Sequence, residues 1–234
     1  MVIILMLFMS ALIAMPNFQS IKNTRQKKQA FFNYLKPHVT SLNQAILKDR
    51  HHILDLQSKK QKQGDLSEPD KDWLQHIAKT YEISNFKIAN QSKWHELLER
   101  VDEVPMSMVL AQAANESAWG TSRFAKQANN LFGQWCFKAG CGIVPKQRSK
   151  GMHHEVRKFT NASDAIKQYM VNLNTNRNYQ LFRQLRMTQR KNDKTIDGYL
   201  LAKGLIHYSE RKEQYVQSIR AIIKQNHLNQ YDIA

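Results

Sequence analysis

One carboxylate near the end of an alanine-rich segment has a setting suited to acid chemistry. Glu116 follows the apolar run from Met108 to Ala114, and Trp119 and Gly120 come directly after it. A glutamate that lies against apolar surface tends to hold its proton at neutral pH. Cleavage of a glycosidic bond needs such a protonated carboxyl group as its general acid. The segment therefore suggests chemistry on sugars.

A helix has to position this glutamate, and the sequence predicts one that begins at Pro105 and ends at Gly120. Proline suits the first turn of a helix, and glycine suits the position after its end. Gln112 and Ala113 precede Glu116 by four and three positions, so we expect them on the same helix face.

The remaining pattern predicts an α+β fold that is mainly α, with one small β insertion. From Gln134 to Phe159 the chain carries glycines, a proline and short β-prone runs, so we expect a β-hairpin or two-stranded lobe there. Elsewhere apolar residues recur every three to four positions, which is typical of amphipathic helices. A polar stretch at 57–66 separates the first two of them. The other expected helices span about residues 25–48, 67–81, 92–101, 121–128, 163–173, 179–186, 195–203 and 209–223.

The first 15 residues are almost wholly apolar, with Ser10 as their one hydroxyl residue. A helix of that length spans about 22 Å, which is short for a hydrocarbon core of about 30 Å. We expect a signal peptide or a membrane anchor. No Lys or Arg precedes the run, and basic residues at 22, 25, 27 and 28 follow it, which opposes export of an anchored chain. An upstream start codon that encodes a basic segment would resolve this conflict; a buried N-terminal helix is the alternative.

The chain is strongly basic, with a formal charge of +16 from 35 basic and 19 acidic residues. Such an excess predicts an anionic partner, which could be nucleic acid, a membrane surface or an acidic wall polymer. A solvated surface without a dedicated partner is the plain alternative. Hydrophobic residues make up 42% of the sequence, which is enough for a packed core and argues against global disorder.

The two cysteines, Cys136 and Cys141, are separated by four residues, and glycines flank the second one. In an exported protein such a pair favours a disulfide that closes a short turn. Free thiols and a zinc site are the alternatives. His153 and His154 follow, but adjacent residues of a strand point to opposite faces, and zinc-binding histidines are usually three to five residues apart. We therefore expect both histidines to be exposed strand residues.

The order of the motifs resembles the glucosaminidase domain of glycoside hydrolase family 73, and more closely the bacterial Bax family within it. The likeness runs from about residue 24 to about residue 215. It implies a lysozyme-like fold and an endo-β-N-acetylglucosaminidase that acts on peptidoglycan. The motifs that carry it are Ala-Asn-Glu-Ser-Ala-Trp-Gly at 114–120, Asn-Asn-Leu-Phe-Gly at 129–133, and a later helix with Tyr169, Asn172 and Tyr179.

With this resemblance the chain divides into a signal peptide or membrane anchor at 1–15, a linker at 16–24, a helical extension at 25–90 and a glucosaminidase domain at 91–228. The protein would lie in the periplasm or be anchored to the inner membrane and face the periplasm. Peptidoglycan glycan strands and an anionic envelope surface are the expected partners. We expect no cofactor, no metal and no nucleic acid.

The resemblance also assigns roles to residues. It makes Glu116 the general acid. Trp119 and Phe132 would stack on pyranose rings, and Asn129 or Asn130 would hydrogen-bond N-acetyl or hydroxyl groups of the substrate. Core packing by the two rings and chain turning by the two asparagines are the structural alternatives.

The tyrosine that the family places near the acid maps to Tyr208, with Tyr215 as the second choice and as a candidate substrate contact. A second carboxylate would serve as nucleophile or base. Glu155 is the one acid between Glu116 and Phe159, and it is our candidate. If Glu155 does not serve, the acetamido oxygen of the substrate is the nucleophile. A lytic transglycosylase, which needs one glutamate, and a non-catalytic wall-binding scaffold are the alternative functions.

Overall fold

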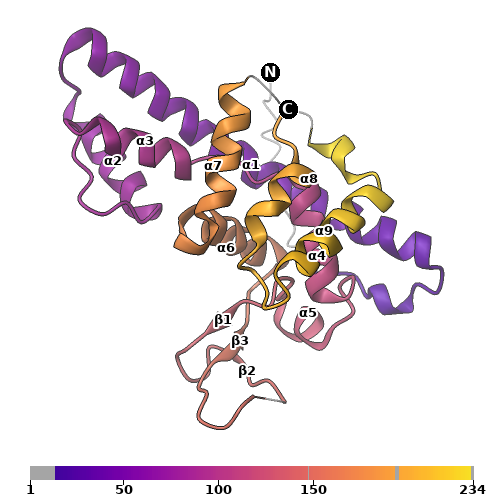
Figure 1. The fold of residues 1–234 in the computed structure, drawn as a ribbon. Helices are drawn as coiled ribbons and strands as arrows, with labels where there is room; N and C mark the ends of the chain where they lie inside the picture. The colour runs from indigo at the N-terminus through magenta and orange to yellow at the C-terminus, as the bar shows by residue number, and fades with distance from the viewer. Residues whose placement is uncertain (1–13, 147, 193–194, 233–234) are drawn as a thin grey trace, which may run out of the picture.

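The computed structural model describes residues 14–146, 148–192 and 195–232, so the apolar run expected as a signal or anchor lies almost wholly outside the described residues. The chain is mainly helical with one small antiparallel sheet, which confirms the expected fold class (Figure 1). In the described part, no helix combines the length and the apolar character needed to cross a membrane. The helices are η1 (Phe18–Ser20), α1 (Thr24–Gln63), α2 (Glu68–Thr80), α3 (Gln91–Arg100), α4 (Met106–Ser117), α5 (Arg123–Ala128), α6 (Ala162–Thr175), η2 (Arg177–Tyr179), α7 (Gln180–Lys191), α8 (Gly198–Leu201), η3 (Ala202–Leu205), α9 (Glu213–Gln225) and η4 (Leu228–Tyr231).

Helix α1 is one continuous helix of 40 residues, and it does not end near residue 48 as the sequence suggested. The side-chain oxygen of Asn23 caps its first turn, and Gly64 ends it with a φ of 83°. The polar stretch was expected to interrupt the helix, but its lysines and glutamines are good helix formers and extend it instead. At about 1.5 Å per residue the helix is about 60 Å long. It crosses the width of the molecule in Figure 1.

Two hydrophobic cores lie along α1. The first half of the helix contributes Phe31, Leu35 and Val39 to a core shared with α4, α6 and α9. The second half contributes Ile53 and Leu56 to a smaller core with α2 and α3. Figure 1 shows α2 and α3 at the opposite end of the molecule from α9. The N-terminal extension therefore completes the main core with its first half and builds a second core with the rest.

An ionic cluster around Asp102 joins α1 to α7 between the two cores. The side chain of Asp102 is 2% exposed, accepts hydrogen bonds from Arg190 at 2.8 and 3.2 Å, and lies 3.6 Å from Arg50 and 3.7 Å from Arg186. Burial alone would raise the pKa of Asp102, but the arginines outweigh it and hold that pKa below its usual value. Arg186 is itself fully buried and donates to the backbone carbonyls of residues 99, 102 and 103.

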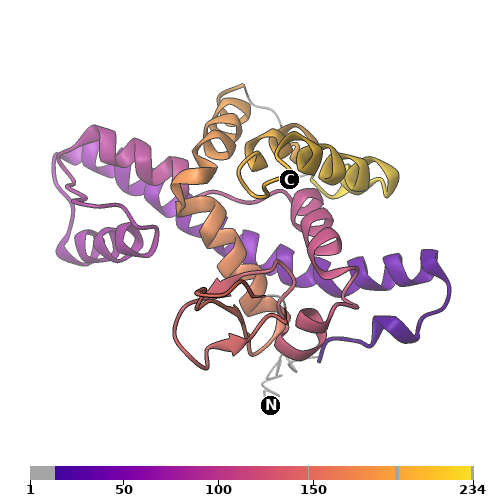
Figure 2. The same ribbon diagram turned by 60° about the horizontal axis from the view of Figure 1, so that its bottom comes forward.

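The described residues between 135 and 157 form a lobe with three short strands, one more than expected. They are β1 (Trp135–Cys136), β2 (Gly142–Ile143) and β3 (Glu155–Arg157), and β3 pairs antiparallel with both others. A disulfide joins Cys136 to Cys141, so neither sulfur is a free thiol or a zinc ligand. In the turned view of Figure 2 this lobe projects forward from the helices, next to α5.

Candidate functional site

Glu116 lies in the last turn of α4 and is partly exposed. The helix ends at Ser117, and the next three residues, 118–120, have φ angles of 50°, 60° and 74°. Two of these residues are an alanine and a tryptophan, for which a positive φ is unfavourable and persists only where the surroundings enforce it. A tight left-handed turn therefore follows the glutamate directly.

Aromatic side chains of the N-terminal extension hold this turn in place. The ring of Trp119 packs edge-on against Phe31 and Phe32, with centroid distances of 6.0 and 5.3 Å. Phe18, in the segment expected to be a linker, is buried and packs on Phe31. A Cβ atom at Gly120 would lie 2.5 Å from the ring of Phe18. These contacts give Trp119 a packing role where we expected it to stack on a sugar.

Tyr215 of α9 forms a direct hydrogen bond with Glu116. Its hydroxyl donates to Oε1 of Glu116 at 2.8 Å, and Nδ2 of Asn115 donates to the same oxygen at 3.0 Å. Tyr215 is 2% exposed, and burial raises its pKa far above the usual range, so the phenol keeps its proton. Tyr215 was the second choice for the tyrosine near the acid and a candidate sugar contact. Its burial and this hydrogen bond make it the direct partner of Glu116.

Tyr208 was the first choice for that role, but its hydroxyl is directed elsewhere. It donates to the backbone carbonyl of Phe132 at 3.0 Å. Its ring stacks on Tyr215, with centroids 5.3 Å apart and planes at 8°. Burial raises the pKa of Tyr208 well above its usual value, so this donor also keeps its proton. Tyr208 thus connects Tyr215 to the loop that precedes the lobe.

The two asparagines of this loop bind backbone. Asn129 ends α5 in a left-handed conformation, and its Nδ2 donates to the carbonyls of residues 159 and 160 at 3.0 and 3.1 Å. Asn130 is 2% exposed and holds the two sides of the lobe together, donating to the carbonyls of residues 134 and 157 at 2.8 and 2.9 Å. Its Oδ1 accepts the backbone N–H groups of residues 132 and 134.

Phe132 is also buried. It is 3% exposed and stacks on Tyr169 of α6, with centroids 4.1 Å apart. Phe132 and Asn130 are both buried and packed against protein, so this geometry favours the structural alternative for each of them over contact with a sugar. The amide of Asn129 is likewise engaged with the protein backbone.

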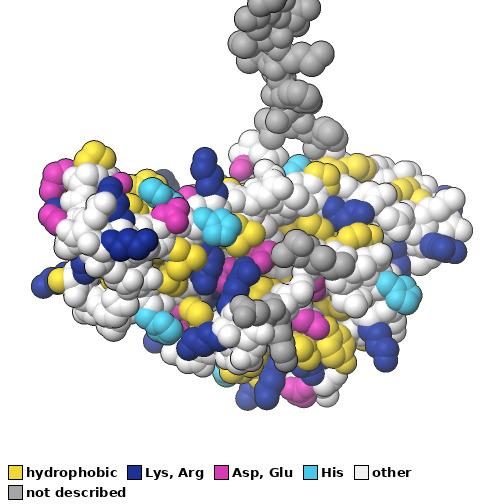
Figure 3. Space-filling view, turned by 90° about the horizontal axis from the view of Figure 1, so that it is seen from above, with side chains coloured by type: hydrophobic (Ala, Val, Ile, Leu, Met, Phe, Trp, Pro, Cys, Tyr) yellow, Lys and Arg dark blue, Asp and Glu magenta, His cyan; other side chains and the backbone are white. Residues whose placement is uncertain are grey.

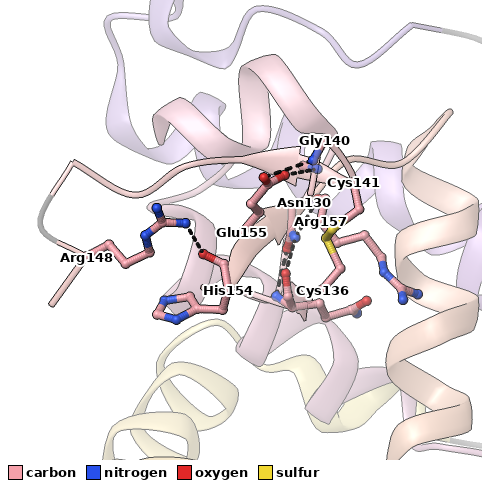
Figure 4. The surroundings of a disulfide bond; sticks show 10 residues. Asn130, Cys136, Gly140, Cys141, Arg148, His154, Glu155 and Arg157 are labelled. Carbon is pink, nitrogen blue, oxygen red and sulfur yellow. Dashed lines mark hydrogen bonds between the residues drawn. A yellow bond between two sulfur atoms is a disulfide. The ribbon is translucent and has the colours of Figure 1, made fainter. Parts of the chain in front are cut away.

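Glu155 closes a turn of the lobe (Figure 4). It is 8% exposed; its Oε1 accepts the N–H of Gly140 at 3.0 Å and its Oε2 accepts the N–H of Gly142 at 2.7 Å. These two backbone hydrogen bonds lower the pKa of Glu155. The disulfide between Cys136 and Cys141 closes the same turn. Since both carboxylate oxygens are occupied, the geometry does not support Glu155 as the second catalytic carboxylate.

Trp135 is an exposed aromatic residue that the sequence reasoning did not single out. It is 52% exposed and stacks on His154 with centroids 3.9 Å apart. His154 is 7% exposed, so the prediction of an exposed histidine is wrong for this residue, which Trp135 covers. The exposure of Trp135 could have been predicted from the alternation of side chains along a strand. Trp135 and Phe137 flank Cys136 and point away from the side that forms the disulfide. The hollow between the lobe and α6 is lined by Gln134, Trp135, Arg157, Gln168 and Asn172.

Basic side chains are spread over the molecule and are frequent on the lobe. Figure 3 shows Lys and Arg scattered among acidic and hydrophobic side chains on one face. On the lobe, Glu155 is the one acidic residue, and it is bound to backbone. The exposed lysines of the lobe and its edge are Lys138, Lys146, Lys150 and Lys158.

Comparison with known proteins identifies the family of this chain. Residues 92–228 match the family described as mannosyl-glycoprotein endo-beta-N-acetylglucosaminidase. The chain is 33% identical over 213 residues to protein Bax of Escherichia coli strain K12. The aligned region covers 91% of this chain and 74% of that protein. The chain is a member of the Bax family with a glucosaminidase domain. No solved structure gives a significant match. Membership supports a role of the glycan-hydrolase type.

In this Bax-family chain some of the residues that pack around the candidate site lie before the start of the glucosaminidase match. The match starts in α3 and includes Glu116, Tyr215 and the lobe. Phe18, Phe31 and Phe32, which hold the turn after the glutamate, lie before it. The segment before the matched domain is therefore part of what shapes its site.

Proposed function

We propose that this Bax-family chain hydrolyses the β-1,4 glycosidic bond after N-acetylglucosamine in peptidoglycan, with Glu116 as the general acid. One observation carries the proposal: Oε1 of Glu116 is held by Tyr215 and Asn115 at the end of α4. Oε2 has no hydrogen-bond partner in the described part of the chain. A carboxyl group with one oxygen fixed and the other free is suited to deliver a proton to a leaving oxygen. Family membership supports the glycan substrate.

The mechanism uses one protein carboxylate, since Glu155 is bound to backbone. The acetamido carbonyl oxygen of N-acetylglucosamine attacks C1 while the bond from C1 to the leaving oxygen breaks. Glu116 gives its proton to that leaving oxygen. Water then adds to C1 of the oxazolinium ion and opens its ring, and the carboxylate of Glu116 takes a proton from this water. The product has a reducing N-acetylglucosamine end, and Glu116 is protonated again.

Trp135 is our candidate for a substrate contact on the lobe. Its exposed indole offers an apolar face to a pyranose ring, and Arg157 and Asn172 line the adjacent hollow. Contacts from Glu116 through Tyr215 and Tyr208 reach the carbonyl of residue 132, three positions before Trp135. The exposed lysines of the lobe favour an anionic polymer or envelope surface.

Digestion of purified peptidoglycan tests the proposal, with mass analysis of the reducing ends. We expect reducing N-acetylglucosamine ends from the wild type and a loss of about 10²- to 10⁴-fold in rate for Glu116→Gln. Glu155→Gln is the matched control, because it removes a carboxylate from the lobe and keeps its size. We expect this variant to loosen the lobe and to release the same products as the wild type.

A lytic transglycosylase is the second candidate, because a single usable carboxylate also suffices for that reaction. Anhydro-muramyl ends in the digest would identify it. Intact binding to peptidoglycan without any turnover by the wild type would instead indicate a wall-binding scaffold. We further propose a place in the cell envelope, motivated by the apolar run of residues 1–15. Recovery of the native protein in the cytoplasmic fraction would contradict that placement.

A further inference from the structure

A chain of hydrogen bonds leads from the protein core to Glu116. The hydroxyl of Tyr169 in α6 donates to Oε1 of Gln112 in α4. Nε2 of Gln112 donates to the hydroxyl oxygen of Tyr215 at 2.8 Å, and Tyr215 donates to Oε1 of Glu116 at 2.8 Å. Gln112, Tyr169 and Tyr215 are 0%, 1% and 2% exposed, so water does not compete for these bonds.

The buried tyrosine hydroxyls determine which group donates and which accepts in this series of hydrogen bonds. Burial raises the pKa of Tyr169 and of Tyr215 far above the usual range, so each phenol carries one proton. The amide oxygen of Gln112 accepts a hydrogen bond from the Tyr169 hydroxyl, so the amide N–H faces Tyr215. The oxygen of Tyr215 is thereby occupied as an acceptor. Its one O–H group therefore donates a hydrogen bond to Oε1 of Glu116.

We infer that Gln112 and Tyr169 are positioning residues that fix Tyr215 as a donor to Oε1 of Glu116, so that the proton to be transferred resides on Oε2. Once the proton has left, the same donor stabilises the negative charge on the carboxylate. No Lys or Arg forms an ion pair with Glu116 within the described residues, so the two donors to Oε1 supply this stabilisation. The catalytic consequence rests on the proposed function, whereas the direction of the hydrogen bonds does not.

The titratable neighbours of Glu116 are phenols on several elements. Tyr169 of α6, Tyr179 of η2, Tyr208 before α9 and Tyr215 of α9 all interact electrostatically with its charge. Burial raises the pKa of Tyr179 to about 12 and those of the other three also rise, so all four are neutral where a glutamate titrates. A change in the titration of Glu116 after removal of one hydroxyl therefore reports a lost hydrogen bond.

The test is a carbon-13 NMR titration of the full chain with labelled glutamate carboxyl groups, in which Glu116→Gln assigns the signal. In Tyr215→Phe we expect this signal to titrate at a higher pH than in the wild type, because a hydrogen bond to the carboxylate is lost. In Tyr169→Phe, which removes a hydroxyl further along the same hydrogen bonds, we expect a smaller move in the same direction. The alkaline limb of the pH profile of kcat/KM should move in parallel.

Tyr208→Phe is the matched control, since it removes a phenol hydroxyl outside this set of hydrogen bonds and keeps the ring that stacks on Tyr215. We expect no shift of the midpoint in this variant. A downward shift in Tyr215→Phe would overturn the inference, because it would mean that Glu116 donates to Tyr215. An unchanged midpoint in Tyr169→Phe would overturn the role of Tyr169. If the wild type shows no turnover, the proposed function fails, while the NMR midpoints still decide the direction of the bonds.

Discussion

Replacing Asp102 by asparagine should destabilise the whole molecule, because this residue is the negative centre of the junction between the two cores. Its carboxylate is 2% exposed and lies within 4 Å of Arg190, Arg50 and Arg186. Asp102→Asn keeps the size of the side chain but leaves these arginines without their central counter-charge. Removing one partner of a buried ion pair costs about 3–5 kcal/mol.

For a chain of this length, 1 kcal/mol corresponds to a shift in Tm of about 2–4 °C, so we expect a Tm about 6–20 °C lower. Differential scanning calorimetry of the full chain gives the value. Glu103→Gln is the matched control, because Glu103 binds the same Arg190 at 2.6 Å but lies nearer the surface. We expect it to cost about 1 kcal/mol or less. An Asp102→Asn Tm no lower than that of Glu103→Gln would refute the reasoning.

The stability of the folded chain at acid pH should also depend on Asp102. The pKa of Asp102 is lower in the folded chain than in the unfolded chain, so below neutrality the unfolded state takes up its proton first. The stability that this group contributes is complete above its unfolded pKa of about 3.9 and is lost as the pH falls toward the folded value. The stability of Asp102→Asn should therefore depend less steeply on pH below about 4 than that of the wild type.

Three further predictions concern the turn after Glu116, the lobe and the contact between α1 and the segment before α4. Gly120→Ala should lose about 1–3 kcal/mol in chemical denaturation, because the residue has a φ of 74° and its new Cβ would meet the ring of Phe18; unchanged stability would contradict this packing. Replacing Cys136 and Cys141 by serine should cost about 2 kcal/mol locally, with faster hydrogen exchange in residues 137–142 and unchanged exchange in α4. Asn43→Ala should cost about 1–3 kcal/mol, because the buried amide exchanges two hydrogen bonds with the backbone of residue 104; a thermal melt that matches the wild type would exclude this role.

Local patterns in the sequence predicted the elements well where neighbouring residues decide the structure. The helix before Glu116, its end near Gly120 and the cap at Ser67 follow from short-range rules of helix formation. The extent of α1 did not follow from these rules. The second half of α1 is helical because its polar residues are good helix formers and because its apolar residues pack against α2 and α3. The strand β2 was not predicted, because Gly142 and Ile143 form no β-prone run and become a strand only by pairing with β3.

The candidate site was predicted at its centre and less well around it. Residue type and motif order led to Glu116, but they could not show which nearby tyrosine reaches it. Tyr208 and Tyr215 are both plausible by sequence, and only the packing of α9 on α4 decides that Tyr215 does so. Asparagine and phenylalanine in a loop suggest ligand binding as readily as structure. Burial favours a structural role for Asn130 and Phe132, while the exposure of Trp135 is the reason that we propose it as a substrate contact.

The placement of the two cores along α1 also sets an order for folding. The smaller core uses residues 53–101, which are close in sequence, so it can close as soon as the chain has been made that far. The main core joins Phe18 and Phe31 to residues as late as Leu228, so the apolar face of the first half of α1 has no complete partner until residue 228 has been made. The turn next to Glu116 depends on those same phenylalanines. We therefore expect the candidate site to form later than the smaller core.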